Sequence, residues 1–290
     1  MTIRISSNQV LDVGIDSMNN SLNDATAWQK RISSGKNYSK ASDNIYAVSR
    51  GVELNFDLSR LQMYKSNQKM ATSLHDNAQT QMDSILNQLT TLKQLFVQAQ
   101  NTALSPANYN ALKIQAEVTR DTILSQMVAK DASGRAIFPS EVHKVQIEPN
   151  VEVDSGINFE MAFGVGGWGG LEPRSSELYS SLDSFVNYLD ARANGAQAIS
   201  EEAATISANL NASFDQLMAA QQTSGAISNQ VDRSNSAMNT LGTQLTAATS
   251  AILDTDMAEA TAAYTRSQTL LNAAQAMFAR LQQSNLFSKL

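Results

Sequence analysis

A run of glycines is the first pattern in this sequence that could carry chemistry. Residues 164–169 read GVGGWG and satisfy the spacing GxGxxG, which in dinucleotide-binding proteins lets a helix N-terminus receive a pyrophosphate. That site needs a strand before the glycines and a helix directly after them, within a parallel β-α-β unit. Here GLEP follows at 170–173, and no crossover helix accompanies the flanking strand pattern. We therefore expect a flexible loop, with a nucleotide-binding enzyme that uses Gly164–Gly170 as the remote alternative.

The histidines and the cysteine count limit nucleophilic and metal chemistry. The chain has no cysteine, so disulfides and thiolate chemistry are excluded, and a structural zinc site would have to come from His75, His143 and carboxylates. His75 falls in a region of helical heptads and His143 precedes a predicted sheet. Neither has a nucleophile motif around it. We expect no metal and no cofactor.

Two pairs of carboxylates remain as candidates for acid and base catalysis. Glu201 and Glu202 are consecutive, and consecutive residues of a helix face different ways. Asp254 and Asp256 stand where a helix accepts N-capping carboxylates. The sequence therefore indicates that the protein is not an enzyme and has no catalytic residues.

Composition indicates long, sparsely charged helices. Of the 290 residues, 42% are hydrophobic, 17% are charged and 6% are aromatic, which allows one to three packed domains. The net charge of -6 gives no sign of a nucleic-acid partner or of an anionic membrane surface, because both require a clustered basic face. The start, MTIRISSNQV, has no signal-peptide pattern and no stretch is long and apolar enough for a membrane span. By that logic the protein is cytoplasmic, unless it is exported by a route that cleaves no signal.

The elements that would position any functional surface are helices at the two ends of the chain. Near the C-terminus, apolar or small residues recur in steps of four and three, which is a heptad seam: Leu253, Met257, Ala260, Tyr264, Ser267, Leu271, Ala274, Phe278 and Leu281. Near the N-terminus the same alternation joins Leu11, Ile15, Met18, Leu22, Ala25, Gln29 and Ile32. We expect the first and last helices to pair. Apolar residues beside the C-terminal seam widen its stripe beyond what one partner would cover: Leu270, Met277, Leu286, Phe287 and Leu290.

Two long rods and a small insertion lie between the terminal helices. Residues 44–104 contain no proline and keep near-heptad spacing, and 199–252 keep it throughout, so these rods should pack antiparallel. Pro106 starts a shorter helix that ends near 131–134, and another helix is predicted at 175–190. Residues 137–163 alternate apolar and polar positions, which predicts a small antiparallel sheet of hairpins, placed at the far end of the rods.

These elements predict a mainly α fold: a long antiparallel helical bundle or coiled coil with paired terminal helices and a small β insertion. We expect three parts. Residues 1–43 plus 253–290 would form a terminal coiled-coil assembly domain, residues 44–136 plus 175–252 a helical rod bundle, and residues 137–174 a small β insertion. Gly35 is expected to end the first helix, with Ser42 or Asp43 starting the next.

Short motifs in a fixed order resemble the flagellin superfamily. They lie at both ends of the chain and in both rods: Ile3-Arg4-Ile5-Ser6, Trp28, Ile32-Ser33-Ser34-Gly35-Lys36, Ala41-Ser42-Asp43-Asn44, Gly134-Arg135-Ala136-Ile137-Phe138, the Gly225 region, Asp254-Thr255-Asp256, Gln268, Leu271, Ala274, Ala276 and Leu286-Phe287-Ser288-Lys289-Leu290. The short insertion, Trp28 and the 134–138 motif favour the family of hook-filament junction proteins, hook-associated protein 3, within it. Asn44-Ile45 stands where flagellins tend to have Asp-Pro, which weakens the alternative, flagellin itself.

The resemblance implies a structural component of the bacterial flagellum, an adaptor that joins the hook-associated zone to the flagellin filament. Its implied partners are hook-associated protein 1, flagellin, further copies of itself in a ring or tube, and an export chaperone that binds the C-terminal segment. It also implies type III export without a cleaved signal peptide and a location at the hook-filament junction.

The large apolar residues of the terminal helices are the predicted assembly interface: Leu11, Ile15, Met18, Leu22, Ile32, Leu253, Met257, Tyr264, Leu271, Phe278, Leu281, Leu286, Phe287 and Leu290. A lone pair of such helices buries little, so we expect these segments to order only on assembly. The turn 33–44 should act as a joint between the terminal pair and the rods.

Overall fold

The computed structural model describes residues 7–38, 40–164, 173–197 and 200–287, with side chains described for all of these except 7–11 and 281–287. The chain divides into two compact units. A terminal unit comprises Met1–Arg60 and Leu241–Leu290, and a central unit comprises Leu61–Thr240. The two longest helices, α2 (Ile45–Ala99) and α6 (Ser200–Leu253), contribute to both units.

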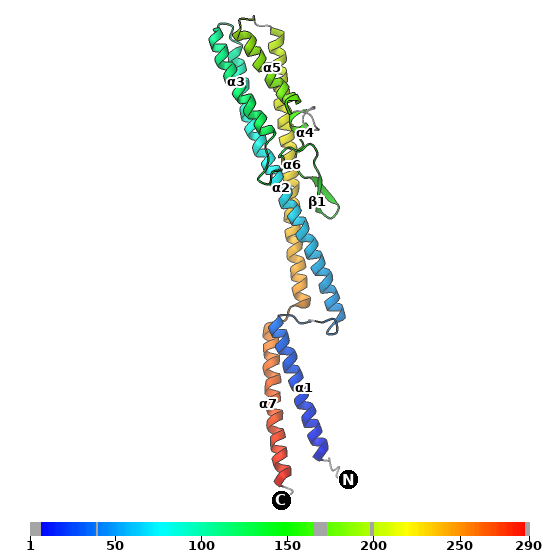
Figure 1. Ribbon diagram of the computed structural model, residues 1–290. Coiled ribbons are helices and arrows are strands. Elements are labelled where there is room, and N and C mark those ends of the chain that lie inside the picture. Colours follow the sequence, from blue (N-terminus) through cyan, green and yellow to red (C-terminus); the bar gives the residue numbers. More distant parts are fainter. Residues whose placement is uncertain (1–6, 39, 165–172, 198–199, 288–290) are drawn as a thin grey trace. The chain divides into compact units, whose positions relative to one another are not determined.

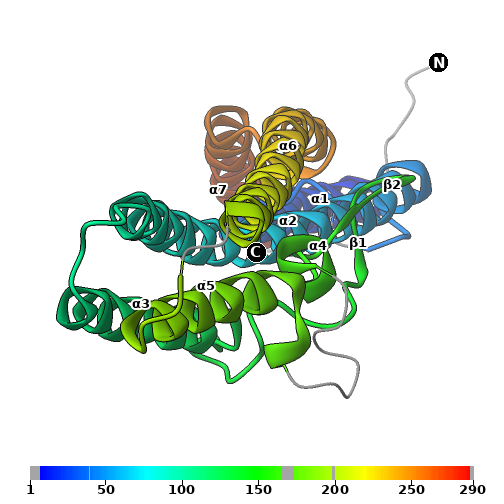
Figure 2. The same ribbon diagram turned by 90° about the horizontal axis from the view of Figure 1, so that it is seen from above.

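The central unit is a helical bundle built on parts of α2 and α6. Two shorter helices, α3 (Pro106–Met127) and α5 (Glu177–Ala193), lie side by side along it (Figures 1 and 2). Lys113 and Arg120 of α3 pair with Asp190 and Asp183 of α5 at 2.6 and 2.8 Å. The mainly α fold with long helices and a small β insertion is therefore as predicted.

Both short helices begin at hydrogen-bonding caps. The Ser105 side chain accepts from the Asn108 backbone N–H before Pro106, and the Ser176 side chain accepts from the Tyr179 N–H. Serine at such a position satisfies a helix N–H that has no partner within the helix. α3 ends at Met127, a few residues earlier than predicted, because residues 131–135 form a separate turn around the Asp131 carboxylate.

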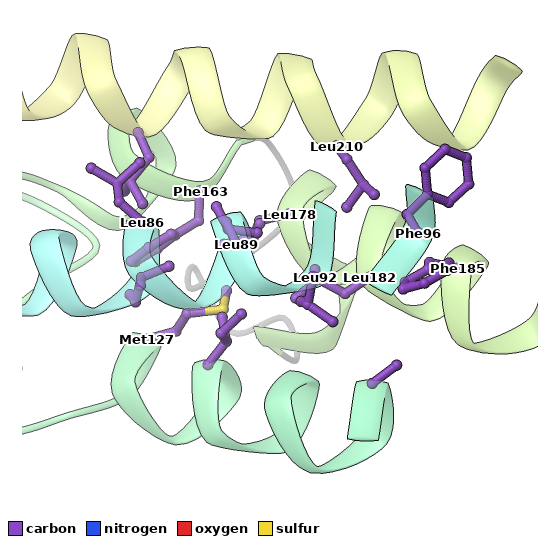
Figure 3. Close-up of a cluster of buried hydrophobic side chains, with 14 of the residues drawn as sticks. Leu86, Leu89, Leu92, Phe96, Met127, Phe163, Leu178, Leu182, Phe185 and Leu210 are labelled. Carbon is purple, nitrogen blue, oxygen red and sulfur yellow. The ribbon is translucent and has the colours of Figure 1, made fainter. Parts of the chain in front are cut away.

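Large apolar side chains fill the centre of this bundle. Leu89 and Phe96 of α2, Met127 of α3, Phe185 of α5 and Leu210 of α6 are all almost completely buried and point towards one another (Figure 3). The rings of Phe96 and Phe185 meet edge to face with centroids 5.4 Å apart. Such burial contributes about 1.5 to 3 kcal/mol for each large side chain, so this cluster holds the central unit together.

The predicted sheet of hairpins is reduced to one hairpin. Strands β1 (Lys144–Glu148) and β2 (Val151–Asp154) pair antiparallel. The alternating pattern over 157–163 was wrongly assigned to a strand, because residues Phe159–Phe163 form a short helix, α4. The Asn158 side chain accepts from the Met161 N–H at 2.8 Å and caps this helix, while Phe159 and Phe163 are buried on its inner side. The Asn158 cap therefore favours a helix over the strand that the alternating pattern predicts.

Buried polar side chains attach the hairpin to the long helices of the central unit. Gln68 donates to the Ile147 carbonyl at 2.8 Å, and His75 Nε2 lies 3.0 Å from the Asp154 carbonyl oxygen. Ser234 of α6 also donates to the Ile147 carbonyl, at 3.2 Å. The hairpin therefore packs on residues 67–75 of α2, well before that helix ends at Ala99. The prediction that the sheet lies at the far end of the rods is wrong.

The terminal unit contains the first and last helices. α1 (Ser7–Ser34) and α7 (Met257–Phe287) lie side by side (Figure 1), as the heptads predicted. Gly35 ends α1 with a φ of +66°, the left-handed conformation that glycine adopts freely. Asn44, rather than Ser42 or Asp43, starts α2, since its side chain accepts from the Ala47 N–H at 3.0 Å.

Candidate assembly interface

The segment that follows α1 and the segment that precedes α7 are hydrogen-bonded to each other. Lys36 and Asp254 form an isolated antiparallel bridge, in which the Asn37 N–H donates to the Leu253 carbonyl at 2.7 Å and the Thr255 N–H to the Gly35 carbonyl at 3.0 Å. The Lys36 ammonium donates to the Asp254 carboxylate at 2.8 Å. That bond, with a further one from Ser250, lowers the pKa of the Asp254 carboxyl below its usual value. The turn predicted as a joint is therefore bonded to the segment that precedes α7.

The two acidic residues predicted as caps have different roles. Asp256 caps α7, because its carboxylate accepts from the Ala258 and Glu259 backbone N–H groups at 2.8 and 3.1 Å. Asp254 instead pairs with Lys36. Leu253 is the last residue of α6 rather than the first of the terminal seam, and it is buried against Gly51, where an added Cβ would lie 2.6 Å from Leu253 Cδ1.

Small side chains line the seam between α1 and α7. Ala25 of α1, and Ala260 and Ser267 of α7, are buried. Half-buried residues continue the seam in both directions: Gly14, Met18, Ser21, Trp28, Tyr264, Leu271, Ala274 and Phe278. A Cβ added at Gly14 would lie 3.6 Å from Phe278 Cδ2. The seam predicted for α7 is therefore occupied from Ala260 to Phe278, but its fully buried members are all small.

On α1 the inward face differs from the predicted seam. Ile15 and Leu22 remain 41% and 52% exposed, whereas Gly14 and Ser21, one residue earlier, are half-buried. Gln29 is also exposed, while its neighbour Trp28 is half-buried beneath the Arg31 guanidinium, 4.5 Å from the ring centroid. Small residues let two helices approach closely, so they occupy the contact and larger apolar residues flank it.

The predicted interface residues thus fall into three groups. Met18, Ile32, Tyr264, Leu271 and Phe278 are half-buried, and Leu253 is buried within the chain. Ile15, Leu22 and Met257 are 41%, 52% and 48% exposed. The remaining positions lie outside the residues whose side chains are described: Leu11, Leu281, Leu286, Phe287 and Leu290.

Further large apolar residues of the pair face solvent. Val13 of α1 is 64% exposed, and Leu270 and Met277 of α7 are 56% and 65% exposed. Leu270 and Met277 are seven residues apart and so share one side of α7. Such a concentration of exposed large hydrophobic residues is typical of a surface that binds another protein. Of these, sequence reasoning missed Val13, because it belongs to no heptad.

The central unit also contains a serine and a histidine in contact, which sequence reasoning did not find. His75 Nδ1 lies 2.9 Å from the Ser224 hydroxyl oxygen. Both residues have no exposed surface, and the other ring nitrogen bonds a backbone carbonyl rather than a carboxylate. A substrate cannot reach this hydroxyl, so the contact attaches the hairpin. The glycine run itself lies outside the described residues from 165 to 172, but Gly164 ends helix α4 and is not preceded by the strand a dinucleotide site requires.

Within the described ranges no His, Cys, Asp and Glu side chains form a group of three that could hold a metal ion. In the same part of the chain, no helix has both the length and the apolar character needed to span a membrane.

Sequence comparison assigns the helical ends of this fold to a family. Residues 5–136 match the description of the bacterial flagellin N-terminal helical region, and residues 197–290 match that of the bacterial flagellin C-terminal helical region. The matched residues cover both paired terminal helices and both long helices, and make up more than half of the chain. The chain therefore belongs to the bacterial flagellin family.

Solved structures share the fold. A protein described as flagellar hook-associated, from Vibrio parahaemolyticus, is 16% identical and has a TM-score of 0.64, with 72% of this chain and 99% of that chain covered. FlgL from Xanthomonas campestris is 13% identical, with a TM-score of 0.52 and coverages of 68% and 99%. The flagellar junction protein FlgL from Legionella pneumophila is 14% identical, with a TM-score of 0.52 and coverages of 71% and 100%. No curated protein sequence matches the chain.

Proposed function

We propose that this protein is a structural component of the bacterial flagellum, an adaptor that joins the hook-associated zone to the flagellin filament. The observation that carries the proposal is the terminal helix pair. Among the residues whose side chains are described, the fully buried members of its seam are all small, whereas Ile15, Leu22, Leu270 and Met277 are between 41% and 65% exposed. Exposed apolar residues on paired chain ends are what subunits stacking along an axis would bury.

The exposed members of the predicted set are the proposed contacts between copies. Ile15, Leu22 and Met257 have exposed apolar surface that a neighbouring copy would bury, and Leu270 and Met277 add to that surface. Leu253 packs against Gly51 within the same chain. Tyr264, Leu271 and Phe278 pack in the seam between α1 and α7. Leu11, Leu281, Leu286, Phe287 and Leu290 stay in the proposal on their sequence pattern alone.

Filament flagellin is the second candidate, since the matched regions are those of flagellins. Two features favour the junction role. Asn44-Ile45 stands where flagellins tend to have Asp-Pro, and only a short segment, about 60 residues, separates the two matched regions. Solved proteins that share this fold include a flagellar junction protein. The proposed assembly domain is the one that the sequence predicts, residues 1–43 plus 253–290.

The proposal implies partners and a location. The partners would be hook-associated protein 1 on one side, flagellin on the other, and further copies of this chain in a ring or tube. An export chaperone would bind the C-terminal segment before type III export without a cleaved signal. No catalysis is involved, and the inaccessible His75 and Ser224 contact supports that view.

Localisation on isolated flagella tests the function. Gold-labelled antibody against the chain should mark a single band at the distal end of the hook. Labelling along the whole filament would instead identify a flagellin, and absence from flagella would refute both. A strain lacking the gene, and the same strain complemented, control for antibody specificity.

A further inference from the structure

Methionine is the only sulfur-containing residue of this chain, which has 11 methionines and no cysteine. Methionine is among the residues most often buried in folded proteins. Among the residues whose side chains are described, five methionines are instead at least 39% exposed: Met63, Met70, Met161, Met257 and Met277. A dissolved oxidant can reach these five, whereas Met82 and Met127 are 0% and 1% exposed and are shielded by the fold.

Two of the exposed methionines lie in α7. Met277 is 65% exposed, the highest value among the five, and Met257 is 48% exposed. Leu270, seven residues before Met277 and on the same side of α7, is 56% exposed. Met257 and Met277 therefore belong to the exposed apolar surface that the proposed function assigns to contact with other subunits.

Methionine differs from the leucine, isoleucine and valine of that surface because its sulfur can be oxidised. Hydrogen peroxide transfers one oxygen atom to Sδ: the O–O bond breaks, an S–O bond forms, and the remaining oxygen leaves as water with both hydrogens. The sulfur is oxidised and the peroxide is reduced. The product, methionine sulfoxide, has a polar oxygen on a side chain that was apolar before.

We propose that Met257 and Met277 are oxidation sites, at which a peroxide makes the exposed surface of α7 unable to join the assembly. The inference rests on the proposed function. A sulfoxide oxygen that is buried at a contact without a hydrogen-bond donor costs free energy that the thioether does not cost. Reductases convert methionine sulfoxide back to methionine, so this block on assembly is reversible.

Oxidation of the dilute free chain tests the accessibility of the two sites. After treatment with hydrogen peroxide, digestion and mass spectrometry, Met257 and Met277 should have oxidised at least about tenfold faster than Met82 and Met127. Equal rates for the two pairs would overturn the inference, because the fold would then not select the methionines of α7.

A partly oxidised pool of the natural chain tests the consequence without any substitution. The pool is incubated with hooks isolated from a strain that lacks the gene, and sulfoxide is measured at each methionine in the bound and unbound chains. Sulfoxide at Met257 and Met277 should be at least about tenfold depleted in the bound chains. Met161, 43% exposed in α4 of the central unit, is the matched internal control and should contain equal sulfoxide in both fractions. If isolated hooks bind no chain, flagella and culture medium of peroxide-treated cells give the same comparison.

Reduction gives the second readout. Chain oxidised at its exposed methionines should bind at least about tenfold less than untreated chain, and methionine sulfoxide reductases with a dithiol should restore the binding. The thermal melting of the central unit should be the same before and after oxidation, which separates loss of the contact from loss of the fold.

Equal sulfoxide at Met257 and Met277 in bound and unbound chains would overturn the inference and leave the proposed function standing. Equal depletion at Met161 would also overturn it, because oxidation would then act on the whole chain rather than on α7. Absence of the untreated chain from flagella would remove both proposals.

Discussion

Single buried polar residues attach the hairpin to the helices of the central unit. His75 uses both ring nitrogens, towards Ser224 and the Asp154 carbonyl, and has no exposed surface. A carbonyl oxygen can only accept, so Nε2 donates to the Asp154 carbonyl. Sequence reasoning placed His75 in a helical heptad and found no role for it. Its partners are 79 and 149 residues away, and no local pattern indicates them.

The two histidines make a matched pair for a stability test. Replacing His75 with Ala leaves a cavity and a carbonyl without its partner, which should lower the free energy of unfolding by about 2 to 4 kcal/mol. His143 is exposed, so His143→Ala should change it by less than about 0.5 kcal/mol. Urea unfolding followed by circular dichroism measures both. Equal effects of the two substitutions would show that the buried contact contributes nothing specific.

Asp131 should make the central unit sensitive to acid. Its carboxylate accepts from the backbone N–H groups of Arg135 and Ser133 and from the Arg135 guanidinium, and these bonds hold the pKa of Asp131 below the ordinary 3.8. A lowered pKa in the folded state contributes stability above the unfolded value that is lost as pH falls through the folded value. We therefore expect the unmodified chain to lose more stability than Asp131→Asn between pH 5 and about pH 3.

Urea unfolding at several pH values gives the comparison, and the difference between the two chains isolates Asp131 from the other carboxylates. Parallel curves for the two chains would contradict this role.

Helices with long heptads were the most predictable elements. The spans of α2, α6 and α7 and the pairing of α1 with α7 follow from apolar spacing alone, because that spacing is what the helices bury. On α1 the predicted Met18, Ala25 and Ile32 lie inward, but Gly14 and Ser21 take the places predicted for Ile15 and Leu22, since neither scores as apolar. Residues Phe159–Phe163 alternate like a strand, and only the Asn158 cap and packing of two phenylalanines make them a helix. The position of the hairpin depends on contacts distant in sequence.

The turn that ends α1 gives a prediction for the joint. Gly35 has a φ of +66° and its carbonyl accepts from the Thr255 N–H. A left-handed backbone at valine costs about 1 to 2 kcal/mol. Gly35→Val should therefore disturb the bonds between the segment after α1 and the segment before α7, and so impair assembly. The melting temperature of the central unit should stay near that of the unmodified chain. Asparagine tolerates left-handed backbone, which makes Gly35→Asn the control with near-normal assembly.

Melting followed by circular dichroism, together with incorporation into flagella, measures the two effects. If Gly35→Val lowers the melting of the central unit as much as it lowers assembly, the turn belongs to the bundle core and is no separate joint.

Across the whole molecule, burial is distributed unequally. The central unit buries Phe96, Phe163, Phe185 and many leucines, whereas the described seam of α1 and α7 fully buries only Ala25, Ala260 and Ser267. Elements with few buried apolar contacts unfold locally at a small cost in free energy. The terminal pair should therefore be the least stable part of the free chain. Neighbouring copies would supply the missing burial, and this coupling would keep the chain from polymerising before export.

Hydrogen exchange in two states tests this account most directly. In the dilute free chain, amides of α1 and α7 should exchange at least about 100-fold faster than those of residues 78–96 in the core of the central unit. In isolated flagella that contain the chain, the same amides of α1 and α7 should become strongly protected. Terminal helices already as protected as the core in the free chain, or unprotected in flagella, would contradict the claim that this protein assembles through its paired ends.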